Sequence, residues 1–411
     1  MADAVVITGL GVVSAVGVGL DAFRAALESG HSALAGAGAP AEVELGGFDL
    51  EAAMAARPAG SEPLRARVQR LGRRGPPGVR LALAAALEAW EGAGLDTSRP
   101  APEEASLVVA GNNLHGRLGW EQRASWERNP AFVSPRLALQ FQDTDLVGVL
   151  SEALELRGEG STVGGASASG NLALLHGRRL LAAGDARVCL VVGPMSDLSP
   201  LEKQSFRNLG AMTEPGECRP FDRASRGFAY GQGTAAVVLE PEAAALRRGA
   251  RVLAELAAGA LALDGRALAD PTVAGEVRVM REALRRAGRS AAEVSYVNAH
   301  GTGSPLGDAV EARALAEVFA GVQPGPWINS TKALTGHCLS AAGVIEAVAT
   351  VLALRDGRVH ANPGLREPIE PRLRFVGRRA EQGELRLALS NGFGFGGINS
   401  SLVLARRSSA S

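Results

Sequence analysis

Ser167 lies in a stretch whose residue types could present a nucleophile. Residues 161–174 read Ser-Thr-Val-Gly-Gly-Ala-Ser-Ala-Ser-Gly-Asn-Leu-Ala-Leu, a β-prone run that meets small residues and continues as an apolar, helix-like pattern. This pattern predicts a sharp strand-to-helix turn with Ser167 at its apex, where the free N–H groups of the new helix face whatever is bound. Three roles are open for Ser167 at this apex: nucleophilic attack on a substrate, binding of a substrate, or packing alone.

Two of the six histidines lie among glycines at the ends of predicted strands. His300 belongs to Asn-Ala-His-Gly-Thr-Gly-Ser-Pro-Leu-Gly-Asp, residues 298–308, and His337 closes Ser-Thr-Lys-Ala-Leu-Thr-Gly-His, residues 330–337. A further loop, residues 391–399, reads Asn-Gly-Phe-Gly-Phe-Gly-Gly-Ile-Asn. Side chains at strand ends project into clefts. A single histidine there is more often structural, but two in matching halves of the chain favour a shared site.

The elements that must position these residues alternate between strand and helix and occur twice. Each half is predicted to have a strand, a helix and a strand, then a strand that turns through small residues into an alanine-rich helix. The turns at residues 165–170 and 336–341 occupy matching places. We therefore expect an α/β fold of two stacked, duplicated units, divided at residues 1–245 with Ser167 and 246–411 with His300 and His337.

Three segments are less clear. The polar, glycine-rich stretch up to about residue 79 is interpreted as loop or insertion, and residues 120–157 as a helical and irregular cover of a site or a subunit interface. The glycine loop after the strand at residues 4–13 could suggest a dinucleotide site. The G-x-G-x-x-G spacing and the downstream acidic residue are missing, which disfavours that interpretation.

Composition narrows the class of protein. Lys+Arg and Asp+Glu both number 43, so the net charge of zero argues against nucleic acid or an anionic membrane as main partner. No apolar run is long enough to span a membrane and no basic leader is apparent, so we expect a cytoplasmic protein. The three cysteines are too few and too scattered for a disulfide framework or a metal site. Only Lys203 and Lys332 are lysines, and Lys332 lies in a polar loop where a compact ammonium could be required.

Taken together, these stretches resemble the β-ketoacyl-acyl-carrier-protein synthases, the elongating ketosynthases of fatty-acid and polyketide assembly. The histidine loops, Arg219-Pro220-Phe221-Asp222 and Gly394-Phe395-Gly396-Gly397 carry the resemblance, which extends over nearly the whole chain. It implies a thiolase fold, with two α/β halves in a five-layer α-β-α-β-α sandwich, and a homodimer. It implies no cofactor bound by the protein and no metal, because the substrate is carried on the phosphopantetheine arm of acyl carrier protein.

The resemblance also assigns residues. His300 and His337 match the paired catalytic histidines, and Lys332 matches the lysine that organises the site. The remaining matches are the supporting Asp308 and Glu346, the gating Phe395, and Thr302, Ser304 and Phe393 along the phosphopantetheine arm.

The departure from the family is at position 167, where the family has a nucleophilic cysteine. A cysteine at a helix N-terminus becomes a thiolate near neutral pH, whereas a serine without a general base is a poor nucleophile. We therefore expect condensation to be lost and malonyl decarboxylation to survive. This resembles the decarboxylating ketosynthases of polyketide β-branching, which supply acetyl-carrier protein to a hydroxymethylglutaryl-synthase-like (HMG-synthase-like) enzyme.

Three alternatives stay open. Ser167 could carry an acyl group as a β-ketoacyl synthase or acyl transferase if a base lies nearby. The chain could be a silent subunit like a chain-length factor, although the presence of both histidines argues against it. It could also be an ordinary synthase with an engineered cysteine-to-serine change. Cys338 is disfavoured as a substitute nucleophile because it does not occupy the apex.

Overall fold

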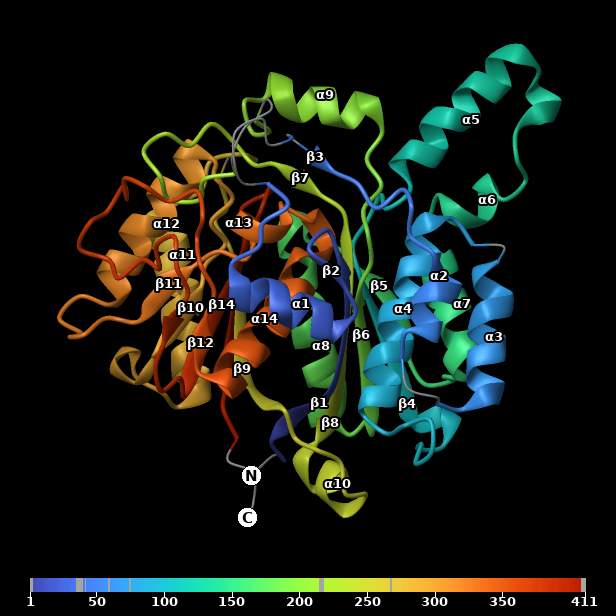
Figure 1. The fold of residues 1–411 in the computed structure, drawn as a ribbon, viewed down its shortest axis with the longest axis horizontal. Helices are drawn as coiled ribbons and strands as arrows, with labels where there is room; N and C mark the ends of the chain where they lie inside the picture. Colours follow the sequence, from blue (N-terminus) through green and yellow to red (C-terminus); the bar gives the residue numbers. More distant parts are fainter. Residues whose placement is uncertain are drawn as a thin grey trace.

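The computed structural model describes residues 3–34, 40, 42–57, 60–73, 75–213, 218–266 and 268–407. Its dominant feature is one mixed sheet in the order β11-β10-β14-β15-β9-β1-β8-β6-β4-β5, with β2 paired to β1 (Figure 1). The first half contributes β1 (Val5–Ser14), β4 (Ala105–Ala110), β5 (Gly160–Val163), β6 (Val188–Gly193) and β8 (Gly233–Pro241). The second half contributes β9 (Ala254–Leu263), β10 (Tyr296–Asn298), β11 (Trp327–Asn329), β14 (Leu387–Gly394) and β15 (Ile398–Ala405).

The two halves of this sheet repeat one topology. In the first, β5 and β6 pair in parallel with β4, and β8 pairs antiparallel with β6 and β1. In the second, β11 and β14 pair in parallel with β10, and β15 pairs antiparallel with β14 and β9. The antiparallel pair of β1 with β9 joins the halves. The expected duplication is therefore present in strand order and direction.

Five layers follow from how the strands divide their side chains. Along β4, Val108 and Ala110 belong to the central apolar core, whereas Leu107 and Val109 belong to the outer core of the first half. Because successive side chains point to opposite faces, each half-sheet separates two cores. The central core holds α8 (Ser169–Ala183) and α14 (Ala342–Asp356), and the outer cores hold α4 (Pro77–Gly92) with α7 (Thr144–Leu154), and α11 (Val273–Ala287) with α12 (Pro305–Val318).

The two central helices cross where neither has a side chain. A Cβ on Gly170 of α8 would lie 2.6 Å from the backbone nitrogen of Val344, and one on Gly343 of α14 would lie 2.7 Å from the backbone nitrogen of Asn171. Such distances exclude any side chain at these two positions without backbone movement. The α-β-α-β-α arrangement expected for a thiolase fold is confirmed.

The remaining elements complete the fold, and most of them are labelled in Figure 1. They are the helices α1 (Leu20–Ser29), α2 (Leu50–Ala55), α3 (Glu62–Gly72), α5 (Gly116–Arg128), α6 (Leu137–Gln140), α9 (Pro200–Asn208), α10 (Glu242–Arg247) and α13 (Lys332–Thr335), and the short strands β2 (Gly17–Val18), β3 (Glu42–Val43), β7 (Tyr230–Gly231), β12 (Arg358–Val359) and β13 (Glu381–Gln382). None of the helices that the structure describes is both long and apolar enough to cross a bilayer.

The stretch up to residue 79 was interpreted as loop or insertion, and the loop interpretation was wrong, since the stretch contains α2 and α3. The side chain of Asp49 accepts hydrogen bonds from Glu51 and Ala52 N–H and so starts α2. Leu64 and Val68 of α3 are buried at helical spacing. The many arginines on the other face of α3 hid this spacing, because they made the whole segment look polar.

The loop at residues 391–399 is shorter than expected. Strand β14 continues through Gly394, and β15 begins at Ile398, so most of the segment is a β-hairpin. Residues 120–157 are helical and irregular as expected, with α5, α6 and α7 among their elements. Figure 1 shows α5 and α6 projecting from the body of the molecule.

Candidate active site

Ser167 stands at the start of α8, on a turn that leads out of β5. Within the turn, Gly165 N–H donates to Ser169 Oγ (2.8 Å), and Ser169 Oγ–H donates to the carbonyl oxygen of Ala166 (2.7 Å). Ala166 has a φ of 49°. The hairpin of β14 packs directly on this turn, because a Cβ on Gly394 would lie 2.5 Å from the carbonyl oxygen of Gly165. The predicted strand-to-helix apex is therefore present, with a half-buried Ser167.

The matching turn of the second half lies opposite. Leu339 has a φ of 51°, and residues 339–341 form the same short 3-10 turn as residues 166–168. Ser167 therefore corresponds to Ser340. The match drawn from the glycines at 165 and 336 was two residues out of register, since it paired Ser167 with Cys338.

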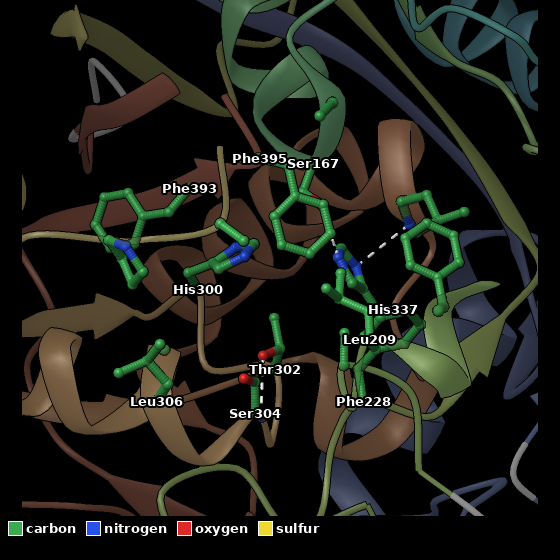
Figure 2. A pocket seen from close by; sticks show the side chains of 18 of the residues that line it. Ser167, Leu209, Phe228, His300, Thr302, Ser304, Leu306, His337, Phe393 and Phe395 are labelled. Atoms are coloured by element: carbon green, nitrogen blue, oxygen red, sulfur yellow. Dashed lines mark hydrogen bonds between the residues drawn. The ribbon is translucent and has the colours of Figure 1, made fainter. Parts of the chain in front are cut away.

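His300 and His337 face Ser167 across one space (Figure 2). Their ring centroids are 5.6 Å apart, and the rings are nearly perpendicular at 86°. His300 follows β10 and His337 follows α13, so the two rings arrive from neighbouring strand ends of the second half. The Oγ of Ser167 lies 2.9 Å from Nε2 of His337. The three side chains thus meet in one place.

In each histidine ring, the contact made by Nδ1 determines which of the two nitrogens carries the proton. Leu339 N–H donates to Nδ1 of His337 (3.3 Å), and the ammonium of Lys332 lies 3.3 Å from Nδ1 of His300. A neutral imidazole with Nδ1 as acceptor has its N–H at Nε2. Burial, and then the charge of Lys332, lowers the pKa of both histidines well below the ordinary value, so both rings are neutral. His337 therefore donates to Ser167 Oγ.

Lys332 is buried behind the two rings with all three of its N–H groups engaged. Its ammonium contacts the carboxylate of Glu346 on α14, the carbonyl oxygen of His300 (2.6 Å) and Nδ1 of the same residue. Both partners of the ion pair are almost fully buried. Burial raises the pKa of Glu346, while Lys332 opposes that rise. The pair holds the His300 backbone and ring in one orientation.

Asp308 shapes the loop that carries His300. Its carboxylate accepts N–H from Phe221 (2.6 Å), Thr302 (3.0 Å) and Gly303 (3.1 Å). Burial raises the pKa of Asp308 to about 7 in spite of these donors. Its contacts are all to backbone, so it positions the loop.

Glu311, one turn further along α12, was not predicted. It accepts N–H from His300 (2.9 Å) and Gly301 (2.8 Å), and from the side chain of Asn391 (3.1 Å). A second carboxylate three residues after Asp308 is on the same helix face, and this spacing was the available signal.

One cavity of about 680 Å³ joins most of the predicted site. Its wall includes Ser167 and both histidines, and also Asp308, Thr302, Ser304, Phe393 and Phe395. Lys332 and Glu346 lie behind the rings and do not line it. Phe395 is 41% exposed and stacks on Phe206 with ring centroids 6.3 Å apart. Together with Leu209, Leu268 and Leu306, which are also exposed, it makes the wall of the cavity apolar toward solvent.

Comparison with known proteins identifies the family of this chain. Residues 2–245 match the model of the β-ketoacyl synthase N-terminal domain, and residues 253–366 match that of the C-terminal domain. The chain is 35% identical over 410 residues to the polyketide biosynthesis malonyl-ACP decarboxylase PksF of Bacillus subtilis, covering 97% of this chain and 96% of the relative. It is 31% identical over 413 residues to 3-oxoacyl-[acyl-carrier-protein] synthase 2 of Coxiella burnetii, covering 98% of each.

A solved structure of a type II polyketide synthase, an acyl-carrier protein in complex with its ketosynthase bound to the hexaketide, has a TM-score of 0.82 and 25% identity. The structural match covers 99% of this chain and 100% of the chain in that complex. The resemblance stated from the sequence is confirmed. The chain belongs to the β-ketoacyl synthase family.

Proposed function

We propose that this ketosynthase-family protein decarboxylates malonyl-acyl-carrier protein to acetyl-acyl-carrier protein and does not condense. In this role it supplies acetyl units for polyketide β-branching, with an HMG-synthase-like enzyme as the downstream partner. The two halves, residues 1–245 and 246–411, share the reaction unequally. The first provides Ser167, and the second provides His300, His337 and Lys332.

The observation that carries the proposal is the hydrogen bond between His337 and Ser167. With Nδ1 of His337 accepting Leu339 N–H, the Nε2 atom that faces Ser167 is a donor. A serine needs an adjacent base to become a nucleophile. His337 gives Ser167 a proton donor instead, so the arrangement disfavours an acyl-serine. It argues against the acyl-transferase and synthase alternatives.

The same two N–H groups suit decarboxylation. When a malonyl thioester loses CO2, negative charge develops on the carbonyl oxygen, and His300 and His337 offer Nε2–H donors from two directions. One preorganised donor of this kind is worth about 2.7–4 kcal/mol. Two donors in a cavity whose outer wall is apolar therefore account for a large acceleration. A silent subunit would have no use for them.

The names of the two relatives include both the proposed activity and its alternative. The Bacillus relative is named a malonyl-ACP decarboxylase, and the Coxiella relative is named a 3-oxoacyl synthase. Because similarity extends to both kinds, the distinction rests on position 167. No other thiol replaces the missing one. Burial raises the pKa of the Cys338 thiol, beside His337, to about 12, so it stays protonated.

The substrate arrives on acyl carrier protein, the partner of the ketosynthase in the similar solved complex. We place the phosphopantetheine arm along the cavity wall of Thr302, Ser304 and Phe393, with Phe395 as the gate at the mouth. No cofactor bound to the protein is required.

The second copy of the chain would cover α5 and α6. Four large apolar side chains in or next to these two helices are 59–69% exposed, which is unusual: Trp126, Phe132, Leu139 and Phe141. A homodimer explains this exposure. Sedimentation equilibrium should give twice the chain mass, and a monomer would contradict the homodimer alone.

The test is to incubate the purified protein with malonyl-carrier protein and to follow both proteins by intact mass. Conversion of the carrier to its acetyl form, with no mass added to the enzyme, is the expected result. An unchanged carrier would overturn the proposal and favour a silent subunit. A stable mass gain on the enzyme would favour acyl transfer.

Two variants of position 167 sharpen the assay. Ser167→Ala removes one hydrogen bond, worth about 0.5–1.5 kcal/mol, so decarboxylation should fall by roughly tenfold at most. Ser167→Cys should still decarboxylate, and should take up an acyl group from acetyl-carrier protein where the wild type does not. Loss of all decarboxylation in Ser167→Ala would show that the hydroxyl is essential and would contradict the proposed division of roles.

A further inference from the structure

Glu276 is a buried acid in the cavity that neither the fold nor the proposed chemistry so far explains. It lies in the first turn of α11 and lines the same cavity as Ser167 and the histidines. Only 1% of the residue is exposed, and its Oε2 atom is buried with no hydrogen-bond partner. Buried carboxyl oxygens are almost always hydrogen-bonded, so an unpaired one in a cavity wall requires an explanation.

The groups around Glu276 cannot neutralise it. Asp264 at the end of β9 and Asp308 and Glu311 of α12 are the charged groups that act on it, and all three are acidic. Each of them already has donors. Asp264 accepts from Thr272 Oγ1 and Asn399 Nδ2 (both 2.9 Å), and Asp308 and Glu311 accept backbone N–H groups. Burial and these three carboxylates raise the pKa of Glu276 well above its ordinary value. Burial without a cation therefore favours the protonated form of Glu276.

The proposed reaction needs a proton. Decarboxylation breaks the bond from C2 of the malonyl group to its carboxylate, releases CO2 and leaves the electron pair in a thioester enolate. The acetyl product forms only when C2 receives one proton. The neutral histidines use their N–H groups to hold the enolate oxygen, and Lys332 is bound to Glu346 and His300. Among the carboxyl groups that line the described cavity, only Glu276 has a buried oxygen with no hydrogen-bond partner.

We propose that Glu276 holds the proton that C2 of the enolate receives, and passes it through water in the cavity. This inference rests on the proposed decarboxylation. The enolate electron pair forms the new C–H bond, and the relay water regains its proton from the Glu276 carboxyl. The resulting carboxylate is then reprotonated from solvent through the cavity mouth. Glu276 is a proton reservoir that does not touch the substrate.

The test compares wild type with Glu276→Gln and Glu276→Asp, using malonyl-carrier protein and acetyl-carrier protein formation as the readout. The wild-type rate should fall as pH rises through the pKa of Glu276, because the proton is then absent. Glu276→Gln should be slower by on the order of 10²-fold, the lower end of general-acid effects, and should lack this high-pH decline. Glu276→Asp should keep the decline. Asp270→Asn, an exposed carboxyl on the same cavity wall, is the matched control and should behave as wild type.

Solvent deuterium provides a second readout that a purely structural role would not move. If protonation becomes slow in Glu276→Gln, its solvent isotope effect should exceed that of wild type. A wild type that forms no acetyl-carrier protein would overturn the proposed function and this inference together. A wild type that is active, with a high-pH decline that persists in Glu276→Gln, would overturn the inference alone. Should Glu276→Gln fail to fold, a flat high-pH profile of the wild type would overturn it equally.

Discussion

The two halves of the molecule have the same topology and contribute unequally to the cavity. Each turns from a strand into a central helix through a 3-10 segment that begins with a positive φ, at Ala166 and at Leu339. The first-half turn brings one small hydroxyl, Ser167. The second half brings the two histidines and the buried pair of Lys332 with Glu346.

This difference shows which property each half provides. The duplicated backbone directs two turns at one cavity, and the crossing at Gly170 and Gly343 holds them together. The two histidines and Lys332 come from the second half, where Leu339 N–H orients the ring of His337 and Lys332 orients that of His300. A serine in place of a nucleophilic cysteine at position 167 therefore leaves the histidines of the second half in place.

Replacing the two lysines, one in each half, should give the largest difference in stability and activity between the halves. Lys332→Met would leave Glu346 buried without its cation, which costs about 3–5 kcal/mol for a pair of this kind. It should lower the free energy of unfolding by this amount and abolish decarboxylation. Lys203→Met in the first half breaks contacts to Glu42 and Glu44 (both 2.5 Å), which are partly exposed. It should cost less and spare the activity. Urea titration and the carrier assay measure both, and equal losses in the two variants would remove the contrast.

The histidines test whether the second half alone stabilises the enolate. His300→Ala and His337→Ala should each reduce kcat for decarboxylation by about 10²–10³-fold, because each removes one preorganised donor. His176→Ala in α8 of the first half is the control, since its side chain is partly exposed and is not part of the cavity wall. A normal rate in either cavity variant would exclude the two-donor mechanism.

The crossing of α8 and α14 at Gly170 and Gly343 tests whether the two halves contribute equally to stability. Gly170→Ala and Gly343→Ala should each destabilise the protein by about 1–3 kcal/mol, the usual cost of overpacking. Gly148→Ala within α7 has open space around the new methyl group and should stabilise by about 0.5–1 kcal/mol. Thermal unfolding of the three variants measures this. If only one crossing variant were destabilised, the halves would not be equivalent there.

The smallest expected effect is that of mild acid. The pKa values of His300 and His337 lie well below the ordinary histidine value, so both stay neutral as pH falls through that value, and activity is lost only in stronger acid. The rate of acetyl-carrier protein formation should therefore change little between pH 7 and pH 6. A loss of half the rate in this interval, with unchanged circular dichroism, would mean that one ring, or Asp308 with its pKa of about 7, becomes protonated there and that activity depends on it.

Comparing predicted with observed elements shows which features of the fold a local sequence pattern can predict. The strand-to-helix turn at Ser167 was predicted correctly, because a β-prone run, small residues and an apolar helical pattern are local signals. Helix α3 was missed, since its buried face is narrow and the rest of it is rich in arginine. Glu311 was also missed, although its spacing from Asp308 was a local signal. Glu276 was missed because a lone glutamate in a helix gives no local sign of its surroundings.

The sequence by itself determined the family, the duplicated α/β fold, and the replacement of the nucleophile by Ser167 opposite two histidines. These depend on residue identity and on short-range patterns. Tertiary structure alone decided which way His337 donates, since Ser167 is 170 positions away and the tautomer depends on Leu339 N–H. It also decided that Glu276 lies unpaired in the same cavity. Hydrogen-bond direction and burial are properties of the assembled site, and no local pattern encodes them.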